Sequence, residues 1–373
     1  MKYPLKKAFC ILCIIIIATT WYIIYNQVNF NDIGSFYTLR KPIHARLVFA
    51  GDLMQHIPQV NAARTNMGGY DYTSSFQGLK EIVEQADIAI FNLETTLTPK
   101  NHYTGYPLFR SPAQLADAIK NIGIDIAVLA NNHICDNGRI GIEFTTSRLD
   151  SLAIAYTGAF IDSLQYQQLN PLNFTANGLH FALLNYTYDT NGMPVPKGTI
   201  VNLIDTTVIE HDLQKIDRTK TDCVIVFFHW GDEYVRQPNK KQQMLADFCH
   251  KRNVEIVMGS HPHVIQPVEA FYDEDSIIRS VTVYSLGNLV SNQRERYRNG
   301  GLVITLDIEK TKNNPIRINP YYTPVWVQLP GYRIIPPTIG DTLSISETQR
   351  ISYQQFLDDT RKLLKHNEVF KER

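Results

Sequence analysis

The fold is decided by four apolar runs that each end in polar residues: RLVFAGDLM (46–54), DIAIFNLE (87–94), DIAVLANNH (125–133) and CVIVFFHW (223–230). Short apolar runs rich in β-branched and aromatic residues predict buried strands. Two more runs have the same character, VEIVMG (254–259) and VTVYSL (281–286), and they lead into Ser-His-Pro-His and Gly-Asn. These six runs predict the buried strands of one domain.

Helical patterns separate these strands, at 77–86, 112–122, 141–153 and 239–252. Ser111 before Pro112 is typical of a helix start. Alternation of strands and helices predicts an α/β fold rather than a sandwich or a bundle. The later runs 180–188, 301–309 and 315–329 predict antiparallel additions to the sheets, and 347–365 predicts a charged amphipathic helix on the outside.

Composition limits the class of protein. The chain has 373 residues with 44% hydrophobic content, enough for a substantial core. Lys plus Arg equals Asp plus Glu, at 36 each, so no overall field attracts the protein to nucleic acid, and no nucleic-acid partner is expected. Any recognition of a polyanion must therefore be local.

The N-terminus carries an uncharged, mostly apolar run over residues 8–25, preceded by Lys2, Lys6 and Lys7. This run is just long enough to cross a bilayer as a helix, and the lysines favour a cytoplasmic N-terminus. A cleaved signal peptide is the alternative. We predict a stub and anchor at 1–26, a linker at 27–44, the main domain at 45–330 and a C-terminal extension at 331–373.

Five cysteines fit this organisation without redox chemistry. Cys10 and Cys13 fall inside the predicted anchor, and Cys135, Cys223 and Cys249 are scattered through the domain. We expect the last three to be buried free thiols, with one disulfide as the alternative.

The polar strand ends predict one site, because the carboxyl ends of parallel strands meet at one edge of a sheet. That site would hold two carboxylates, several Asn and four His. Read one at a time, Asp52 could cap a turn, Asn131 and Asn132 could be turn residues, and His229 could be a hydrogen-bonded core histidine. Together they indicate a divalent cation, and an N/O ligand set suits zinc, manganese or iron.

The motifs GDLM (51–54), NLE (92–94), LANNHICDNG (129–138), HWGDEY (229–234), GSHPHVIQPVE (259–269) and SLGN (285–288) resemble, in this order, those of the CapA/PgsA family of capsule and poly-γ-glutamate synthesis proteins. That family in turn resembles the calcineurin-like metallophosphoesterases. The resemblance implies a four-layer sandwich, with two mixed β-sheets flanked by helices.

The resemblance also implies residue roles. The ligands of one or two ions would be Asp52, Glu94, Asn132, His229, His261 and His263, with Glu94 bridging. His133 would be the general acid and Asp136 an orienting carboxylate. Substrate would contact Asn92, Arg110, Asn131, Glu233 and Asn288, although Arg110 could equally form a surface ion pair. The phosphoesterases begin with Asp-x-His, whereas this chain has Asp52-Leu53-Met54, so one expected metal ligand is absent, and His56 would be either a substitute ligand or a loop residue.

Two functions follow from the resemblance. One is a metal-dependent phosphoesterase-like hydrolase that acts on an anionic envelope polymer or its lipid-linked precursor. The other is a non-catalytic, polymer-binding accessory subunit of a membrane synthase or export complex. Both place the domain outside a bacterial cytoplasmic membrane, held there by the N-terminal helix.

Overall fold

The computed structural model of the protein describes residues 42–311, 314–365 and 369–373. The part from Ile43 to Arg373 is one compact unit. The predicted anchor and most of the predicted linker lie outside the described residues. Within the described ranges, no helix combines the length and the apolar character needed to cross a membrane.

The larger sheet is mixed and has nine strands, in the order β18-β17-β16-β1-β2-β5-β6, with β15 beside β1 and β19 beside β17. Strands β1, β2, β5 and β6 are parallel, whereas β16 runs antiparallel to β1 and β17, and β17 runs antiparallel to β18 and parallel to β19. The strands are β1 (Ile43–Leu53), β2 (Ile88–Leu93), β5 (Ile126–Val128), β6 (Ala155–Thr157), β15 (Asn288–Val290), β16 (Gly300–Lys310), β17 (Arg317–Gln328), β18 (Arg333–Ile335) and β19 (Lys371–Glu372).

The smaller sheet has six strands in the order β13-β14-β12-β11-β9-β8. They are β8 (Leu172–Ala176), β9 (Leu179–Thr187), β11 (Cys223–His229), β12 (Ile256–Ser260), β13 (Val268–Tyr272) and β14 (Ile278–Val283). Strand β9 corrects a prediction, because it pairs parallel with β11 and antiparallel only with β8. The prediction of 301–309 and 315–329 as antiparallel additions is confirmed by β16 and β17.

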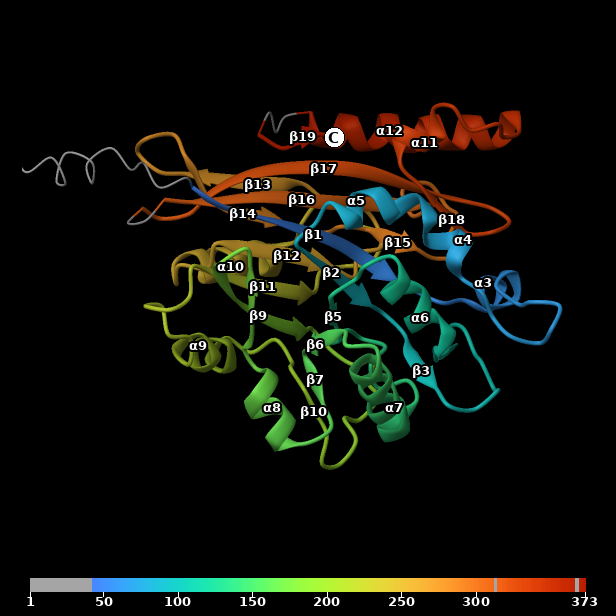
Figure 1. Ribbon diagram of the computed structural model, residues 1–373, viewed down its shortest axis with the longest axis horizontal. Helices are drawn as coiled ribbons and strands as arrows, with labels where there is room; N and C mark the ends of the chain where they lie inside the picture. Colours follow the sequence, from blue (N-terminus) through green and yellow to red (C-terminus); the bar gives the residue numbers. More distant parts are fainter. Residues whose placement is uncertain (1–41, 312–313, 366–368) are drawn as a thin grey trace, which may run out of the picture. The chain divides into compact units, whose positions relative to one another are not determined.

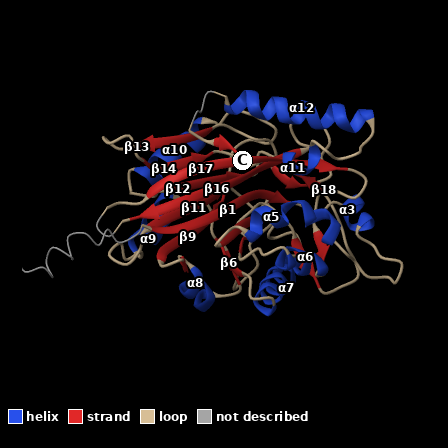
Figure 2. Ribbon diagram, turned by 45° about the horizontal axis from the view of Figure 1, so that its top comes forward, coloured by secondary structure: helices blue, strands red, loops and turns tan. Residues whose placement is uncertain are grey.

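The two sheets face each other, and helices cover their outer faces (Figures 1 and 2). Side chains alternate along β1, so that Leu47 and Phe49 enter the core between the sheets while Val48 and Ala50 face the outer helices. The helices of this outer face are α4 (Thr73–Phe76), η1 (Gln77–Leu79), α5 (Lys80–Glu84), α6 (Gln114–Asn121) and α7 (Gly138–Ser151).

On the other side, α9 (Thr206–Gln214) and α10 (Lys240–His250) cover the outer face of the smaller sheet. The predicted amphipathic helix is confirmed as α12 (Glu347–Leu364), which lies along β17 and buries Tyr353, Phe356 and Leu357 (Figure 2). The predicted α/β class with two mixed sheets flanked by helices is therefore confirmed.

Shorter elements connect these layers. They are α3 (Ile57–Ala62), α8 (Ser163–Leu169), α11 (Pro337–Gly340), β3 (Thr96–Thr98), β4 (Arg110–Pro112), β7 (Ala159–Phe160) and β10 (Ile200–Val201). The predicted helix start at Ser111 and Pro112 is wrong, because both residues lie in β4, which pairs with β3. The N-cap of α6 is Ala113.

The three cysteines of the described chain, Cys135, Cys223 and Cys249, are buried free thiols, as predicted.

Candidate metal centre

The strand ends bring together the side chains that the sequence singled out. Asp52 lies in β1, Glu94 follows β2 directly, His229 ends β11, and His261 and His263 follow β12. All five are buried, with exposed fractions of 3% or less. Because the parallel strands of both sheets end at this edge, residues far apart in the sequence become neighbours.

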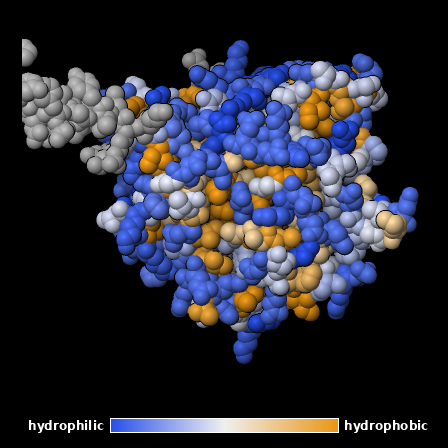
Figure 3. All heavy atoms as spheres, viewed as in Figure 1, coloured by the Kyte–Doolittle hydropathy of each residue, from blue (hydrophilic) through white to orange (hydrophobic). Residues whose placement is uncertain are grey.

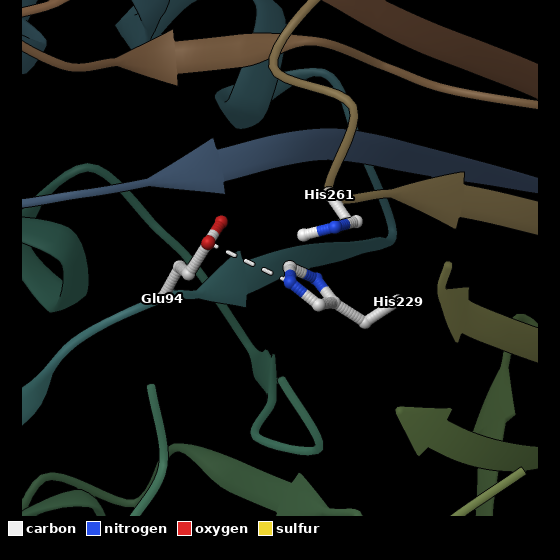
Figure 4. Close-up of side chains that lie close together, drawn as sticks. All are labelled: Glu94, His229 and His261. Carbon is white, nitrogen blue, oxygen red and sulfur yellow. Dashed lines mark ion pairs between the residues drawn. The ribbon is translucent and has the colours of Figure 1, made fainter. Parts of the chain in front are cut away.

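Glu94 is at the centre of the cluster. Its Oε1 lies 3.5 Å from His229 Nε2 and 3.8 Å from His263 Nε2. Three sets of potential ligand atoms each fall within 4.8 Å: Glu94, His229 and His261; Asp52, Glu94 and His263; Glu233, His261 and His263. Figure 4 shows the first set, with the Glu94 carboxylate and the two imidazole rings converging.

Two atoms of the cluster indicate what it can bind. Glu94 Oε1 and His261 Nδ1 are buried and have no hydrogen-bond partner. Such atoms are rare in folded proteins, because each loses its hydration without compensation. A divalent cation would satisfy both, and carboxylate oxygen with imidazole nitrogen suits zinc, manganese or iron. The residues therefore fit a metal ion.

The two carboxylates of the centre have opposite character. Burial raises the pKa of Asp52, but hydrogen bonds from His263 Nδ1 at 2.9 Å and from Asn92 Nδ2 at 2.9 Å outweigh it, so that the pKa is lowered. Burial and the neighbouring Asp52 charge raise the pKa of Glu94 well above its usual value. Like charges held close together in a dry site oppose ionisation of one member, and a bound cation would remove that opposition.

His229 and His261 are held neutral. Burial, followed by the neighbouring His263, lowers the pKa of His261 to about 3. Burial, followed by the nearby His261, His263 and His133, lowers the pKa of His229 well below its ordinary value. A neutral imidazole has a lone pair to donate to a metal, so both rings are ready to act as ligands near neutral pH.

The two asparagines after β5 have different contacts. Asn132 Oδ1 lies 2.8 Å from His229 Nε2, which places this oxygen at the cluster. Asn131 Nδ2 donates to the Leu93 carbonyl at 2.8 Å and to Asn92 Oδ1 at 3.3 Å. Asn131 thus braces the loop against β2, while Asn132 offers an oxygen ligand.

A histidine–carboxylate pair lies in the same loop. His133 Nδ1 is 2.8 Å from Asp136 Oδ2, and both side chains are buried. The same Asp136 oxygen accepts a hydrogen bond from the Phe109 backbone N–H at 2.7 Å. The Phe109 ring meets the His133 ring edge-on at 4.6 Å. Asp136 therefore orients the His133 ring, an arrangement suited to proton transfer.

Other predicted residues lie around the cluster. Arg110 Nε is buried without a partner, and among the described residues the Arg110 side chain forms no ion pair. Glu233 is exposed and near His261 and His263. Asn288 Nδ2 donates to the backbone oxygens of His263 and Arg298, so this amide nitrogen braces the loops.

His56 has a structural role in the described chain. It is the N-cap of α3, and its Nδ1 lies 3.2 Å from Gln59 Oε1. The same nitrogen accepts a hydrogen bond from the Asn292 N–H at 3.3 Å. Burial lowers the pKa of His56 to about 4. It belongs to none of the three ligand sets found among the described residues.

The sequence interpretation missed the residues that follow β9. The Tyr188 ring lies 4.4 Å from the His261 ring, and Asn191 Oδ1 accepts a hydrogen bond from Asn132 Nδ2 at 3.1 Å. The signal was present, since the run 180–187 also ends in polar residues, Tyr-Asp-Thr-Asn. We expected this run to be antiparallel, which would put its carboxyl end at the edge of the sheet opposite the site. In the structure it is parallel to β11, so its carboxyl end lies beside that of β11. Ser260, whose Oγ lies 2.9 Å from His229 Nδ1, was also missed as a site residue.

Backbone constraints hold the centre in shape. A Cβ on Gly51 would lie 2.2 Å from the carbonyl oxygen of Gly287, the residue just before β15, so only glycine allows β1 to approach this segment so closely. His261 and His263 adopt φ of 96° and 56°. Non-glycine residues seldom occupy this region, and such strain is concentrated at functional sites.

The fold and the site define an α/β protein of two facing sheets with a buried carboxylate–histidine centre of the metal-binding kind. The chain belongs to the family described as bacterial capsule synthesis protein PGA_cap, whose pattern matches residues 46–293. This match covers the strand ends from Asp52 to Asn288 that form the centre.

Relatives agree with this membership. The PGA biosynthesis protein CapA of Bacillus subtilis is 26% identical over 284 residues, covering 73% of this chain and 70% of the relative. The capsule biosynthesis protein CapA of Bacillus anthracis is 25% identical over 298 residues, covering 76% and 67%. A probable polyglutamine synthesis accessory protein of Mycobacterium tuberculosis is 23% identical over 203 residues, covering 50% and 52%.

Solved structures give weaker likenesses. The NAD nucleotidase of Haemophilus influenzae has a TM-score of 0.47 at 10% identity, covering 90% of this chain and 58% of its own. A 5′-nucleotidase of Candida albicans has a TM-score of 0.45 at 15% identity, covering 86% and 58%. This chain thus spans little more than half of each enzyme, and no assignment rests on these likenesses.

Proposed function

We propose that this protein is a divalent-metal-dependent hydrolase of phosphoester bonds in the synthesis of a bacterial capsule polymer of the poly-glutamate type. The observation that carries the proposal is the pair of unsatisfied buried atoms, Glu94 Oε1 and His261 Nδ1, next to the oriented His133–Asp136 pair. A metal-binding centre and a proton donor together are what such hydrolysis requires.

The ligands of the proposed ion or ions are Asp52, Glu94, Asn132, His229, His261 and His263. A bound divalent ion would act as a Lewis acid on the scissile group and lower the pKa of water toward neutrality. The Asp136 carboxylate accepts a hydrogen bond from His133 Nδ1 and so fixes the orientation of the imidazole ring. His133 would then pass the proton on its Nε2 to the departing oxygen.

The proposed substrate is an anionic envelope polymer or its lipid-linked precursor, and membrane synthase subunits are the proposed partners. The printed names of the Bacillus relatives, which concern PGA and capsule biosynthesis, support this choice. The predicted anchor at residues 8–25 supports a location on the outer side of the cytoplasmic membrane.

A polymer-binding accessory subunit is the second candidate. Two observations favour it: the Mycobacterium relative is named an accessory protein, and Met54 in Asp52-Leu53-Met54 stands where the phosphoesterases have the histidine of Asp-x-His. In this case the metal would order the binding surface without turning over a substrate.

The test uses the full-length chain, loaded in turn with manganese, zinc and iron, and a panel of phosphomonoesters and phosphodiesters. His133→Ala is expected to abolish turnover while elemental analysis finds unchanged metal content. His250→Ala is the control, since His250 is a partly buried histidine that bonds Val254 and Thr282 away from the centre. Metal binding without any turnover, and unchanged polymer output with His133→Ala, would favour the accessory subunit.

A further inference from the structure

A basic cleft of about 520 Å³ lies between two loops and the C-terminal half of α12. Its polar lining consists of Arg236, Gln237, Arg296, Tyr297, Asp359 and Lys362. Three cationic side chains face one carboxylate, so the lining has a net positive charge, whereas the whole chain is neutral. In Figure 3, hydrophilic residues cover most of the upper edge, where α12 lies in Figure 1, apart from a hydrophobic patch at the right.

The guanidinium groups of the cleft are fixed in advance. Arg236 donates to the Asp359 backbone oxygen at 3.0 Å, and its guanidinium lies 4.2 Å from the centre of the Tyr297 ring. Arg296 lies 5.0 Å from the centre of the same ring and donates two hydrogen bonds, at 2.9 and 2.8 Å, to the Asp359 carboxylate. Side chains held in this way lose little entropy when they bind a ligand.

Two cations of the cleft remain available. The Nε of Arg236 is buried without a hydrogen-bond partner. Within the described ranges, neither Arg236 nor Lys362 has an acidic side chain within 4.0 Å; Asp359, the carboxylate of the lining, pairs with Arg296 instead. A guanidinium with a free Nε–H and an ammonium, neither paired with an acidic side chain, are suited to carboxylate groups in one concave site.

Residues that line the cleft lie close along the chain to residues of the metal centre. Glu233, a member of one ligand set, precedes Arg236 by three residues, so their Cα atoms are separated by at most about 10 Å. Gln266, which follows His263 closely, donates through Nε2 to the Val235 and Gln237 backbone oxygens at 2.8 and 3.3 Å. One extended ligand can therefore occupy both places.

We infer that this cleft is a binding subsite for a polycarboxylate chain of the poly-glutamate type, holding its side-chain carboxylates while the chain extends from the metal centre. The inference rests on the polymer named in the proposed function and does not require that the centre be catalytic. Successive carboxylates along an extended chain match separate cations better than a single compact anion would.

The test measures the fluorescence anisotropy of a fluorescein-labelled γ-linked oligoglutamate with the full-length chain, in EDTA and in manganese. Arg236→Gln with Lys362→Gln is expected to weaken binding roughly ten-fold, the effect of two partly exposed charge contacts. The control, Lys251→Gln with Arg317→Gln, removes the same charge at exposed positions outside the cleft and should bind as the unmodified chain does. Thermal unfolding of both double variants checks that they are folded.

Three results would overturn the inference. The cleft variant could bind as tightly as the unmodified chain, or both double variants could lose affinity equally, which would indicate a diffuse charge effect. The chain could also bind anionic vesicles through these residues and not the oligoglutamate. If the chain hydrolyses phosphoesters and the cleft variant binds the oligoglutamate normally, only this inference is contradicted. If the cleft variant binds the oligoglutamate more weakly but the chain hydrolyses no phosphoester, only the proposed hydrolase is contradicted.

Discussion

Glu94→Gln should weaken metal binding without disrupting the fold. The substitution keeps the size of the side chain and removes one ligand from two of the three sets that the described residues form. Glu94 is fully buried beside Asp52, and burial already raises its pKa. A neutral amide therefore costs the metal-free protein little. Only the metal-loaded form should lose stability.

The size of the effect follows from linkage between binding and folding. A metal at one hundred times its dissociation constant stabilises the native state by about 2.7 kcal/mol. Loss of a shared ligand that weakens binding roughly one-hundred-fold leaves about 0.4 kcal/mol at the same concentration. In a domain of this size, the metal-induced rise in Tm should drop from roughly 5 °C to roughly 1 °C.

Differential scanning fluorimetry with and without manganese or zinc measures this change, and elemental analysis counts the bound ions. Glu233→Gln is the matched control, because Glu233 is exposed and belongs only to the third ligand set. It should keep most of the metal-induced shift. The reasoning fails if Glu94→Gln shows the same shift as the unmodified chain.

Three further predictions concern the surroundings of the centre. Asp136→Asn should lower kcat by about 10- to 100-fold at unchanged metal content, because it loosens the His133 ring; an unchanged kcat would exclude this role. Gly51→Ala should lower the free energy of unfolding by at least about 2 kcal/mol in chemical denaturation, since the added Cβ meets the Gly287 oxygen at 2.2 Å; a neutral result would contradict the close approach. The lowered pKa of His261, about 3, means that below pH ~6.5 the unfolded chain binds more protons than the metal-free native state, so stability falls as the pH drops toward 3. His261→Gln should flatten that slope in unfolding measured at several pH values, and an unaltered slope would refute the assignment.

The strands of the core were predictable from sequence because each is a short apolar run ending at polar residues. The run 223–228 became β11, with every residue buried. Burial of both faces imposes this pattern directly on the sequence. Strand order and direction were less accessible, as β9 shows, because pairing depends on contacts that periodicity does not encode.

Local signals misled where distant contacts decided the structure. Ser111 and Pro112 suit a helix start, but pairing of β4 with β3 draws them into an extended segment, and Ser111 Oγ bonds Thr95 Oγ1 at 2.6 Å. The cluster of Glu94 with His229 and His261 was predictable because residue type and strand end coincide. The bracing use of the Asn288 amide nitrogen was not predictable, since the backbone oxygens that it meets belong to remote loops.

The pairing of Asp52 with Asn288, where β15 joins β1, sets an order of events for biosynthesis. A ribosome must release almost three hundred residues before this last strand can reach the first one. The proposed ligands lie between Asp52 and His263, so a growing chain lacks part of the set until most of the domain has been synthesised. The metal should therefore bind only after the domain has been synthesised, and a nascent chain that ends before residue 288 should not bind it.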